Sequence, residues 1–290
     1  MYEMIYPDIA EVTHMSKADE LFISNCQEIL EHGVWDTDQA VRPHWADGTA
    51  AHTIKKFGIV NRYNLQEEFP ILTLRRTYLR SCVDELLWIW QKKSNNIHDL
   101  HSHIWDAWAD ENGSIGKAYG YQLGVKHQYP EGEFDQVDRV LYDLKHNPTS
   151  RRIMTNLYNF QDLHEMALYP CAYSMTFNVS GKTLNAILNQ RSQDMLTANG
   201  WNVTQYAVLV YMLAQVSGLQ AGELVHVIAD AHIYDRHVPL VEKLLKNPTY
   251  AAPKFMLDPA VTDFYAFTRD SVSLEGYKYS DLPDEIPVAV

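Results

Sequence analysis

A cysteine, an arginine and a serine are the side chains best suited to chemistry in this sequence. Cys171 begins the run CAYSMTFNVSG, and Arg191 and Ser192 close the run that follows it, KTLNAILNQRS. A thiolate is a nucleophile, a neighbouring cation lowers the pKa of a thiol, and guanidinium and hydroxyl groups bind anions. A lone cysteine is also common as a small buried apolar residue. The chemistry therefore depends on whether the fold brings these three side chains together.

The two runs predict a β-hairpin. Between positions 173 and 179 apolar side chains alternate with polar ones, which is the period of a half-buried strand, and Gly181 suits the turn. If the hairpin folds about Gly181, Cys171 lies opposite Arg191, whereas a two-residue loop places it opposite Ser192. In either register an anion-binding group faces the cysteine, and a facing arginine would favour the thiolate.

Two arginines and an asparagine stand where further elements begin. Arg151 and Arg152 precede a strand-like run, where they suit either a phosphate clamp or a solvated strand start. Asn202 opens an apolar, helix-like run over 202–218. Its amide would either cap that helix or pair with the adjacent donor and acceptor of a ligand.

Three polar side chains share a strand face further along. The run HVIADAHIYDRHVP at 226–239 is strand-like, with Asp230, His232 and Tyr234 at alternate positions and His237 beyond them. Alternate residues of a strand point to the same side. We therefore expect a binding site on that face.

An acid lies inside the apolar pattern of a helix predicted over 77–93. Leu79, Val83 and Leu86 recur at helical spacing there, and Glu85 stands among them. At a helix edge the carboxylate would stay in water. If it is buried, its pKa rises towards the range of a general acid or base.

The remaining elements must position these groups. Helices are expected over 17–32 and 134–148, and a bent strand pair over 52–65. No linker or repeat divides the chain, and 46% hydrophobic residues suffice for a large core, so we expect one domain. His98, His101 and His103 have no cysteine or acid at familiar ligand spacing, and no metal site is predicted.

The sequence as a whole is acidic. Its net charge of −13 opposes binding to a nucleic-acid backbone, so any phosphate that it binds belongs to a small ligand. No apolar run reaches the roughly 20 residues that span a bilayer, and the N-terminus lacks a secretory pattern. Cys26, Cys82 and Cys171 are odd in number and far apart, which favours a reducing compartment. We expect a cytoplasmic protein.

With these residues assembled, the chain resembles the thymidylate synthases over nearly its whole length. The most specific pieces are ALYPC with Cys171, QRSQD at 190–194, Asn202, and DAHIYDRH with His232 and Tyr234. Supporting pieces are DELLW around Glu85, IWDAWADENG with Trp105, SRRI at 150–153 and the terminal PVAV.

The resemblance implies an α+β fold and a methyl-transfer reaction. The expected fold is a single domain over residues 1–290, with a large mixed sheet packed by helices and one sheet face forming a homodimer interface. The expected reaction converts dUMP to dTMP, with 5,10-methylenetetrahydrofolate supplying the carbon and the hydride and leaving as dihydrofolate. No metal takes part.

The resemblance also implies catalytic roles for particular residues. Cys171 would attack C6 of the uracil ring, with Arg191 favouring its thiolate. Glu85 would organise proton transfer at the pyrimidine O4, and Tyr119 would support removal of the C5 proton through water. Asn202 would pair with the O4 and N3 edge of the base, and Asp194 completes the catalytic set.

Binding roles follow from the same resemblance. Arg191 and Ser192 would hold the dUMP phosphate, and Arg151 and Arg152 would reach it from the partner subunit. The rest of the predicted dUMP site consists of Gln190, Asp194, Asn202, His232 and Tyr234, the last two at the deoxyribose hydroxyl. The predicted folate site consists of Trp105, Asp194 and the carboxylate of Val290.

Several positions depart from the usual pattern of the family. Gly48 stands where an arginine is usual in the phosphate loop, and Arg42 is a candidate to replace it. The other departures are Ala172 after the cysteine, and Ala198, Gly200 and Trp201 before Asn202.

Two alternatives stay open at this point. Ala172 and Trp201 stand where water could be admitted, which would suit a dUMP hydroxymethylase of the same superfamily. A non-catalytic regulator that binds nucleotide or RNA is the other alternative, and the charge of −13 opposes its RNA-binding form.

Overall fold

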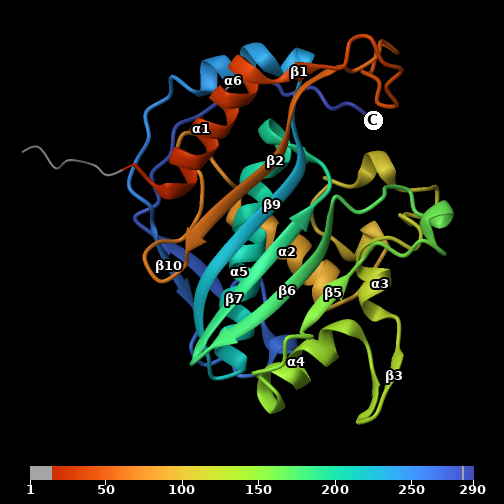
Figure 1. Cartoon of the computed structure of the whole chain (residues 1–290), viewed down its shortest axis with the longest axis vertical. Coiled ribbons are helices and arrows are strands. Elements are labelled where there is room, and N and C mark those ends of the chain that lie inside the picture. Colours follow the sequence, from red (N-terminus) through yellow and green to blue (C-terminus); the bar gives the residue numbers. More distant parts are fainter. Residues whose placement is uncertain (1–14, 283) are drawn as a thin grey trace, which may run out of the picture.

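The computed structural model describes residues 15–282 and 284–290, and its centre is a seven-stranded sheet (Figure 1). The sheet runs in the order β1 (Val34–Trp35), β2 (Thr53–Asn64), β9 (Gln220–Tyr234), β7 (Thr183–Gln190), β6 (Ala172–Ser180) and β5 (Met154–Asn156), with β8 (Gln193–Asp194) also paired to β9. Strands β7 and β8 run parallel to β9, and the other neighbours are antiparallel. The predicted α+β class with a large mixed sheet is confirmed.

Two small sheets lie apart from the main one. Strands β3 (His127–Tyr129) and β4 (Gly132–Phe134) form one hairpin. Strands β10 (Lys254–Leu257) and β11 (Val272–Glu275) form the other pair. The N-terminal segment that lacks a secretory pattern falls mainly within residues 1–14, which lie outside the described residues.

The helices begin where the sequence supplies a cap. Ser16 accepts the backbone N–H of Asp19 at the start of α1, and Asp135 does the same for Asp138 at the start of α4. The α-helices are α1 (Lys17–His32), α2 (Leu79–Trp90), α3 (Gly120–Gly124), α4 (Gln136–His146), α5 (Gly200–Val216) and α6 (Val238–Leu244). The predictions over 17–32, 77–93 and 134–148 are confirmed, with ends that differ by up to three residues.

One face of the sheet is covered and the other is open. In Figure 1, α5 and α2 lie behind the long strands, and α5 contacts α2, β7 and β9. Most side chains of α5 are buried, which explains why its sequence is apolar on nearly every side. The core therefore lies between the sheet and this helix pair, and none of the helices in the described part of the chain crosses the face that is turned to the viewer.

The hairpin brings Cys171 opposite Arg191 by a route that the sequence did not predict. Ser180 pairs with Thr183, so the loop has two residues and Gly181 adopts a positive φ of 64°. That register alone would place Cys171 opposite Ser192. An irregularity between Ala172 and Ser174 shifts the pairing by one residue. The N–H of Arg191 then donates to the Cys171 carbonyl at 3.0 Å.

Three sequence predictions need correction. The bent strand pair over 52–65 is one strand, β2, which changes its buried face near Gly58, where φ is 79°. The run 226–239 leaves the sheet at Tyr234, and His237 lies in a 3-10 turn, because β2 ends its pairing at that point. Helix α5 begins at Gly200, so Asn202 lies inside its first turn and is not a cap.

Candidate active site

Cys171 lies at the open end of the hairpin, held on both sides. A guanidinium nitrogen of Arg191 is 3.8 Å from the Cys171 sulfur, and the same guanidinium donates to the carbonyls of Tyr169 at 2.7 Å and Pro170 at 3.1 Å. The backbone N–H of Cys171 donates to the Tyr119 hydroxyl at 3.2 Å. The cysteine therefore faces a cation whose position is fixed by the segment that precedes the thiol.

The charge state of the thiol differs from the prediction. Burial is the largest influence and raises the pKa of Cys171, while the charges of Arg191 and Arg42 lower it. The net effect is a raised pKa. Arg191 acts in the predicted direction, but the prediction of a net shift towards thiolate is wrong, because desolvation of the thiolate outweighs the two cations.

Glu85, Trp105, Trp201 and Gln205 form a buried group that we call the Glu85 cluster. The Glu85 side chain lies on α2 with 6% of its surface exposed, so the reading that placed it at a wet helix edge is wrong. The Trp105 indole donates to Oε1 at 2.6 Å, while the Trp201 indole and the Gln205 amide donate to Oε2 at 2.6 and 2.7 Å. Burial raises the pKa of Glu85, and these donors oppose the rise.

Tyr119 connects this cluster to the cysteine. Its ring meets the Trp105 ring edge-on at 5.0 Å, and its hydroxyl accepts the N–H of Cys171. Tyr119 has a φ of 44°, which is a costly conformation for a residue with a side chain. Burial raises the pKa of the Tyr119 hydroxyl, so it remains a neutral donor and acceptor.

Asn202 lies in a chain of side-chain amides. Its Oδ1 accepts from the Gln190 amide at 3.2 Å and from the Gln193 amide at 3.3 Å. Gln190 Oε1 in turn contacts Nε2 of His226, a buried histidine whose pKa burial lowers to about 3. Neutral His226 must donate at that nitrogen, so the orientation of the Gln190 amide is set from the core.

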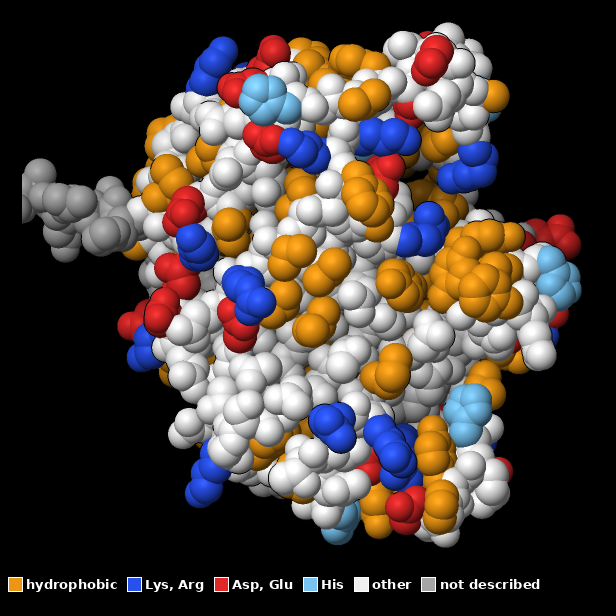
Figure 2. Space-filling view, viewed as in Figure 1, with side chains coloured by type: hydrophobic (Ala, Val, Ile, Leu, Met, Phe, Trp, Pro, Cys, Tyr) orange, Lys and Arg blue, Asp and Glu red, His pale blue; other side chains and the backbone are white. Residues whose placement is uncertain are grey.

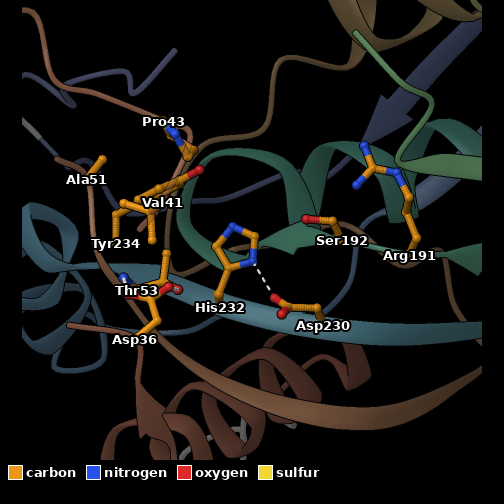
Figure 3. Close-up of a pocket in the computed structure, with 10 residues that line it drawn as sticks. All are labelled: Asp36, Val41, Pro43, Ala51, Thr53, Arg191, Ser192, Asp230, His232 and Tyr234. Atoms are coloured by element: carbon orange, nitrogen blue, oxygen red, sulfur yellow. Dashed lines mark hydrogen bonds and ion pairs between the residues drawn. The ribbon is translucent and has the colours of Figure 1, made fainter. Parts of the chain in front are cut away.

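A cavity of about 240 Å³ opens beside Ser192 (Figure 3). Figure 3 shows the Ser192 hydroxyl and the His232 imidazole directed towards the same space, with Arg191 at one end and Tyr234 at the other. His232 Nδ1 lies 2.8 Å from the Asp230 carboxylate. The cavity is lined by Asp36, Val41, Pro43, Ala51, Thr53, Arg191, Ser192, Asp230, His232 and Tyr234. The shared strand face predicted for residues 230, 232 and 234 therefore borders a real cavity.

Known proteins resemble this chain in sequence and in fold. A family model described as thymidylate synthase matches residues 20–290. The thymidylate synthase of Bacillus licheniformis is 43% identical over 272 residues, which cover 92% of this chain and 97% of that protein. The thermostable thymidylate synthase A from Bacillus subtilis has a TM-score of 0.89 and 41% identity, and the match covers 94% of this chain and 99% of that chain. The chain belongs to the thymidylate synthase family.

Membership of this family confirms the predicted reaction class. Thymidylate synthases are methyltransferases that form dTMP from dUMP, with methylenetetrahydrofolate as co-substrate. The thymidylate synthase of Bacillus phage phi3T is a further relative, 42% identical over 272 residues. A hydroxymethylase or a non-catalytic regulator is not favoured by any of these matches. Across residues 15–282 and 284–290, no cluster of metal-ligating side chains and no helix able to cross a membrane is found.

Asp194 and the C-terminal tail meet at a histidine in this thymidylate synthase fold. Asp194 accepts the backbone N–H groups of Leu196 and Thr197, and its carboxylate lies 3.6 Å from His237 Nδ1, an ion-pair distance. His237 Nε2 donates to the Pro287 carbonyl at 2.8 Å. Burial raises the pKa of Asp194. Hydrogen bonding and the charge of His237 have the larger combined effect, so the pKa is lowered overall.

The last residue of the tail is paired with a loop near the cavity. Val290 and His44 exchange two backbone hydrogen bonds, at 2.8 and 3.0 Å. Arg42 lies in the same loop and is exposed. Burial raises the pKa of both Cys171 and Tyr234, and the charge of Arg42 opposes this rise at both groups. The tail and the candidate phosphate arginine are therefore attached to one segment.

Arg151 and Arg152 do not border the cavity of their own chain. Both side chains are exposed in the bend before β5, which leaves the phosphate clamp and the solvated strand start equally open. The other predicted residues lie around Cys171, in the Glu85 cluster and along the cavity, while Asp194 lies at His237 and Val290 at His44.

Sequence reasoning missed two kinds of residue at the site. Asp36 and Thr53 line the cavity, where the Asp36 carboxylate accepts the N–H and the hydroxyl of Thr53 at 2.8 and 2.7 Å. No local pattern marks them. Trp201 and Gln205 hold Glu85, and their spacing of four residues in a helix was a signal that they share a face.

Proposed function

We propose that the chain methylates dUMP with Cys171 as the nucleophile. The observation that carries the proposal is the position of the Cys171 sulfur, 3.8 Å from the Arg191 guanidinium at the end of the strand that leads into the Ser192 cavity. Attack of the thiolate on C6 of uracil makes C5 nucleophilic. Burial raises the pKa of the thiol in the free protein, so the thiol proton leaves as the S–C6 bond forms and passes through water to the negative charge that develops on O4.

The nucleotide extends from the cavity to the Glu85 cluster in this proposal. Arg191 and Ser192 hold the phosphate, and Arg42 takes the role of the usual phosphate-loop arginine at the opposite wall. His232 and Tyr234 bind the deoxyribose hydroxyl from the β9 face. Seven of the ten cavity residues have polar side chains that can form hydrogen bonds to a phosphate or a hydroxyl, which supports this assignment.

The base is read by Asn202 and its neighbours. Gln190 and Gln193 hold Asn202 Oδ1, which fixes the orientation of the amide before a ligand arrives. Uracil presents an O4 acceptor beside an N3–H donor. Asn202 Nδ2 donates to O4, and Oδ1 accepts N3–H in place of one of its two glutamine donors. Gln190 therefore contributes to dUMP binding mainly by orienting Asn202.

Proton transfer falls to Glu85 and Tyr119. Glu85 exchanges a proton with the pyrimidine O4 through water, since its raised pKa lies closer to neutrality than that of a solvated carboxyl. Tyr119 assists removal of the C5 proton through water. Its hydroxyl is already oriented by the N–H of Cys171, the residue that binds C6.

The residues near Trp105 fit a folate. The rings of Trp105, Trp108 and Tyr119 meet edge-on with centroids 5.0 to 5.7 Å apart, which suits contact with a flat heteroaromatic ligand. Asp194 offers a carboxylate acceptor for ring N–H groups. The bound folate supplies the one-carbon unit and the hydride. The carboxylate of Val290 helps to close the site and exclude water.

We also propose a homodimer in which Arg151 and Arg152 complete the partner's phosphate site. Figure 2 shows apolar side chains gathered over the sheet face that no helix covers. Phe57 on β2 is 86% exposed there, and Val60, Met154 and Ile187 add to the same face. A monomeric protein rarely exposes such a contiguous patch. The exposed positions of Arg151 and Arg152 at the edge strand leave them available to a second subunit.

Two broader assignments belong to the same proposal. Residues 1–290 act as a single catalytic domain, because the buried residues of the described chain form one hydrophobic cluster. The protein works in the cytoplasm, where thiols stay reduced, since Cys26, Cys82 and Cys171 are all free.

The test supplies dUMP and methylenetetrahydrofolate and measures the formation of dihydrofolate from its absorbance. The wild-type chain should produce dihydrofolate together with dTMP, whereas a hydroxymethylase would leave tetrahydrofolate. Cys171→Ala should abolish turnover and retain dUMP binding, because phosphate and sugar contacts do not involve the thiol. Cys26→Ala is the matched control, a buried cysteine whose loss should lower stability but retain the reaction. Substantial turnover by Cys171→Ala would refute the mechanism.

A further inference from the structure

Trp201 contacts Glu85 in a way that the proposed reaction leaves unexplained. The Trp201 indole and the Gln205 amide both donate to Oε2 of Glu85, at 2.6 and 2.7 Å. Trp105 donates to Oε1 at 2.6 Å. An ionised carboxylate accepts about four hydrogen bonds, two at each oxygen. Oε2 is therefore filled, and one acceptor position remains, on Oε1.

The two donors to Oε2 come from one face of one helix. Trp201 and Gln205 are four residues apart in α5, a spacing that aligns side chains. Asn202 follows Trp201 directly, and its Oδ1 is held by the amides of two glutamines. One turn of α5 therefore donates two hydrogen bonds to the Glu85 carboxylate and also carries the Asn202 amide. These are the two groups that are proposed to face the pyrimidine.

We propose that Trp201 is a positioning residue that closes Oε2 of Glu85 and so directs proton exchange to Oε1. The inference rests on the role proposed above for Glu85 at the pyrimidine O4. Without the indole donor, Oε2 has an open acceptor position and competes with Oε1 for the proton. The carboxyl then spends part of its time with the proton on Oε2, and a smaller fraction of the molecules carry it on Oε1.

The surroundings of Glu85 contain few other charges. Asp84 is turned towards His101, which donates its N–H at 2.9 Å and whose Nδ1 lies 2.8 Å away. Burial raises the pKa of Cys82, Tyr119 and Tyr206, so these neighbours stay neutral at neutral pH. Burial and the charge of Asp84 raise the pKa of Glu85 while the three donors lower it, so removal of one donor should raise it further.

The test removes the indole N–H while keeping the ring. Benzothienylalanine at position 201 replaces the N–H by sulfur with little change of shape, and Trp201→Phe is the simpler variant. In both, kcat should fall about tenfold with little change in KM for dUMP, because a hydrogen bond to a charged group is lost where no substrate contact is made. The pH at which Glu85 titrates should rise by about one pH unit. This titration is measured from the infrared band of the Glu85 carboxyl group, which is identified by its absence in Glu85→Gln.

Benzothienylalanine at position 88 is the matched control, because it keeps a ring of the same shape against Trp105, whose ring centroid lies 5.9 Å away. The Trp88 indole is buried and donates to the Asn96 carbonyl at 2.9 Å, so the same N–H is lost at a different acceptor. This control should lower stability and leave the Glu85 titration unchanged. An unchanged titration and kcat in the protein with benzothienylalanine at position 201 would overturn the inference and leave the proposed function intact. Absence of dUMP methylation by the wild-type chain would instead overturn the proposed function.

Discussion

The Glu85 cluster and the cavity beside Ser192 accommodate charge in opposite ways. Glu85 is almost completely buried, and its carboxylate is bound by neutral N–H donors from two other segments of the same chain. The cavity is open to solvent. Arg191 lines it and is half-buried, while Arg42, which stands between the lining residues Val41 and Pro43, is exposed. The first region is complete within one chain. The charge of the second region is compensated only when an anion binds.

The difference follows from the cost of moving charge out of water. A buried carboxylate is tolerated only where hydrogen bonds replace its hydration, so its donors must be in place when the protein folds. A phosphate that binds in the cavity supplies the opposite charge, and until it binds the cations remain hydrated. We therefore expect changes in the Glu85 cluster to affect the chemical step, and changes around the cavity to affect binding.

Glu85→Gln should cause the largest loss. The amide cannot exchange a proton, and its NH2 group would face the N–H donors of the cluster. We expect kcat to fall by about 10² to 10⁴, the usual contribution of a general acid or base, with dUMP binding retained. Steady-state kinetics and equilibrium dUMP binding measure the two quantities. Glu20→Gln, on the surface of α1, is the control, and a Glu85→Gln protein with near-normal kcat would contradict the comparison.

Arg152→Ala should weaken dUMP binding by roughly tenfold to a hundredfold, as expected for a lost charge-assisted hydrogen bond. Mixing tests whether the loss occurs in the partner's site. The assay uses a dUMP concentration at which Arg152→Ala dimers show little activity. Inactive Cys171→Ala subunits exchanged at random with Arg152→Ala subunits should then recover about a quarter of wild-type activity, because about half of the dimers are heterodimers and each contains one intact site. Arg80→Ala subunits, which alter another exposed arginine, should be fully active alone. No recovery, with exchange verified, would assign Arg152 to its own chain or to solvent.

Deletion of Val290 should reduce turnover about tenfold and spare dUMP binding. The deletion removes both backbone hydrogen bonds to His44 and the terminal carboxylate, and so loosens the closed tail. Stopped-flow measurement of dihydrofolate formation, with dUMP bound beforehand, isolates the step. Val288→Ala alters an exposed side chain of the tail and keeps its backbone, so it should be close to wild type. Equal rates for the deletion and the control would exclude a closing role.

The smallest expected effect concerns the pH dependence of stability at Asp194 and His237. The lowered pKa of Asp194 contributes stability above the unfolded value of about 3.9, and this is lost as the pH falls through the folded value. Burial lowers the pKa of His237 but Asp194 raises it more, so its contribution is present below the unfolded value of about 6.5 and is lost at higher pH.

The ion pair should therefore stabilise the protein most between about pH 4 and 6.5. His237→Asn should remove about 1 kcal/mol of the free energy of unfolding in that range and less above it. Urea unfolding at several pH values measures the difference. A loss that does not vary with pH would indicate packing against Trp45 and Tyr234 as the main role of His237.

Much of the fold could be predicted from the sequence because its helices and strands depend on local residue patterns. Alternation over 173–179 predicted strand β6, the apolar run before Gly218 predicted α5, and the opposition of Cys171 to an anion-binding group held in either register. The residue that lies directly opposite Cys171 in the hairpin could not be predicted from the sequence. It depends on a register shift near Tyr173, where the neighbouring strand β5 also pairs, and no local signal marks that irregularity.

The sequence by itself determined the family, the helices α1, α2, α4 and α5, the β6–β7 hairpin and the candidate reactive side chains, because residue types and their spacing are local properties. Only the tertiary structure decided the charge states. Burial reversed the expected shift of the Cys171 pKa, and it placed Glu85 among indole donors that lie 20 and 116 residues away. Desolvation and hydrogen bonding sum over every segment that packs around a group, and packing between distant segments is absent from any local pattern.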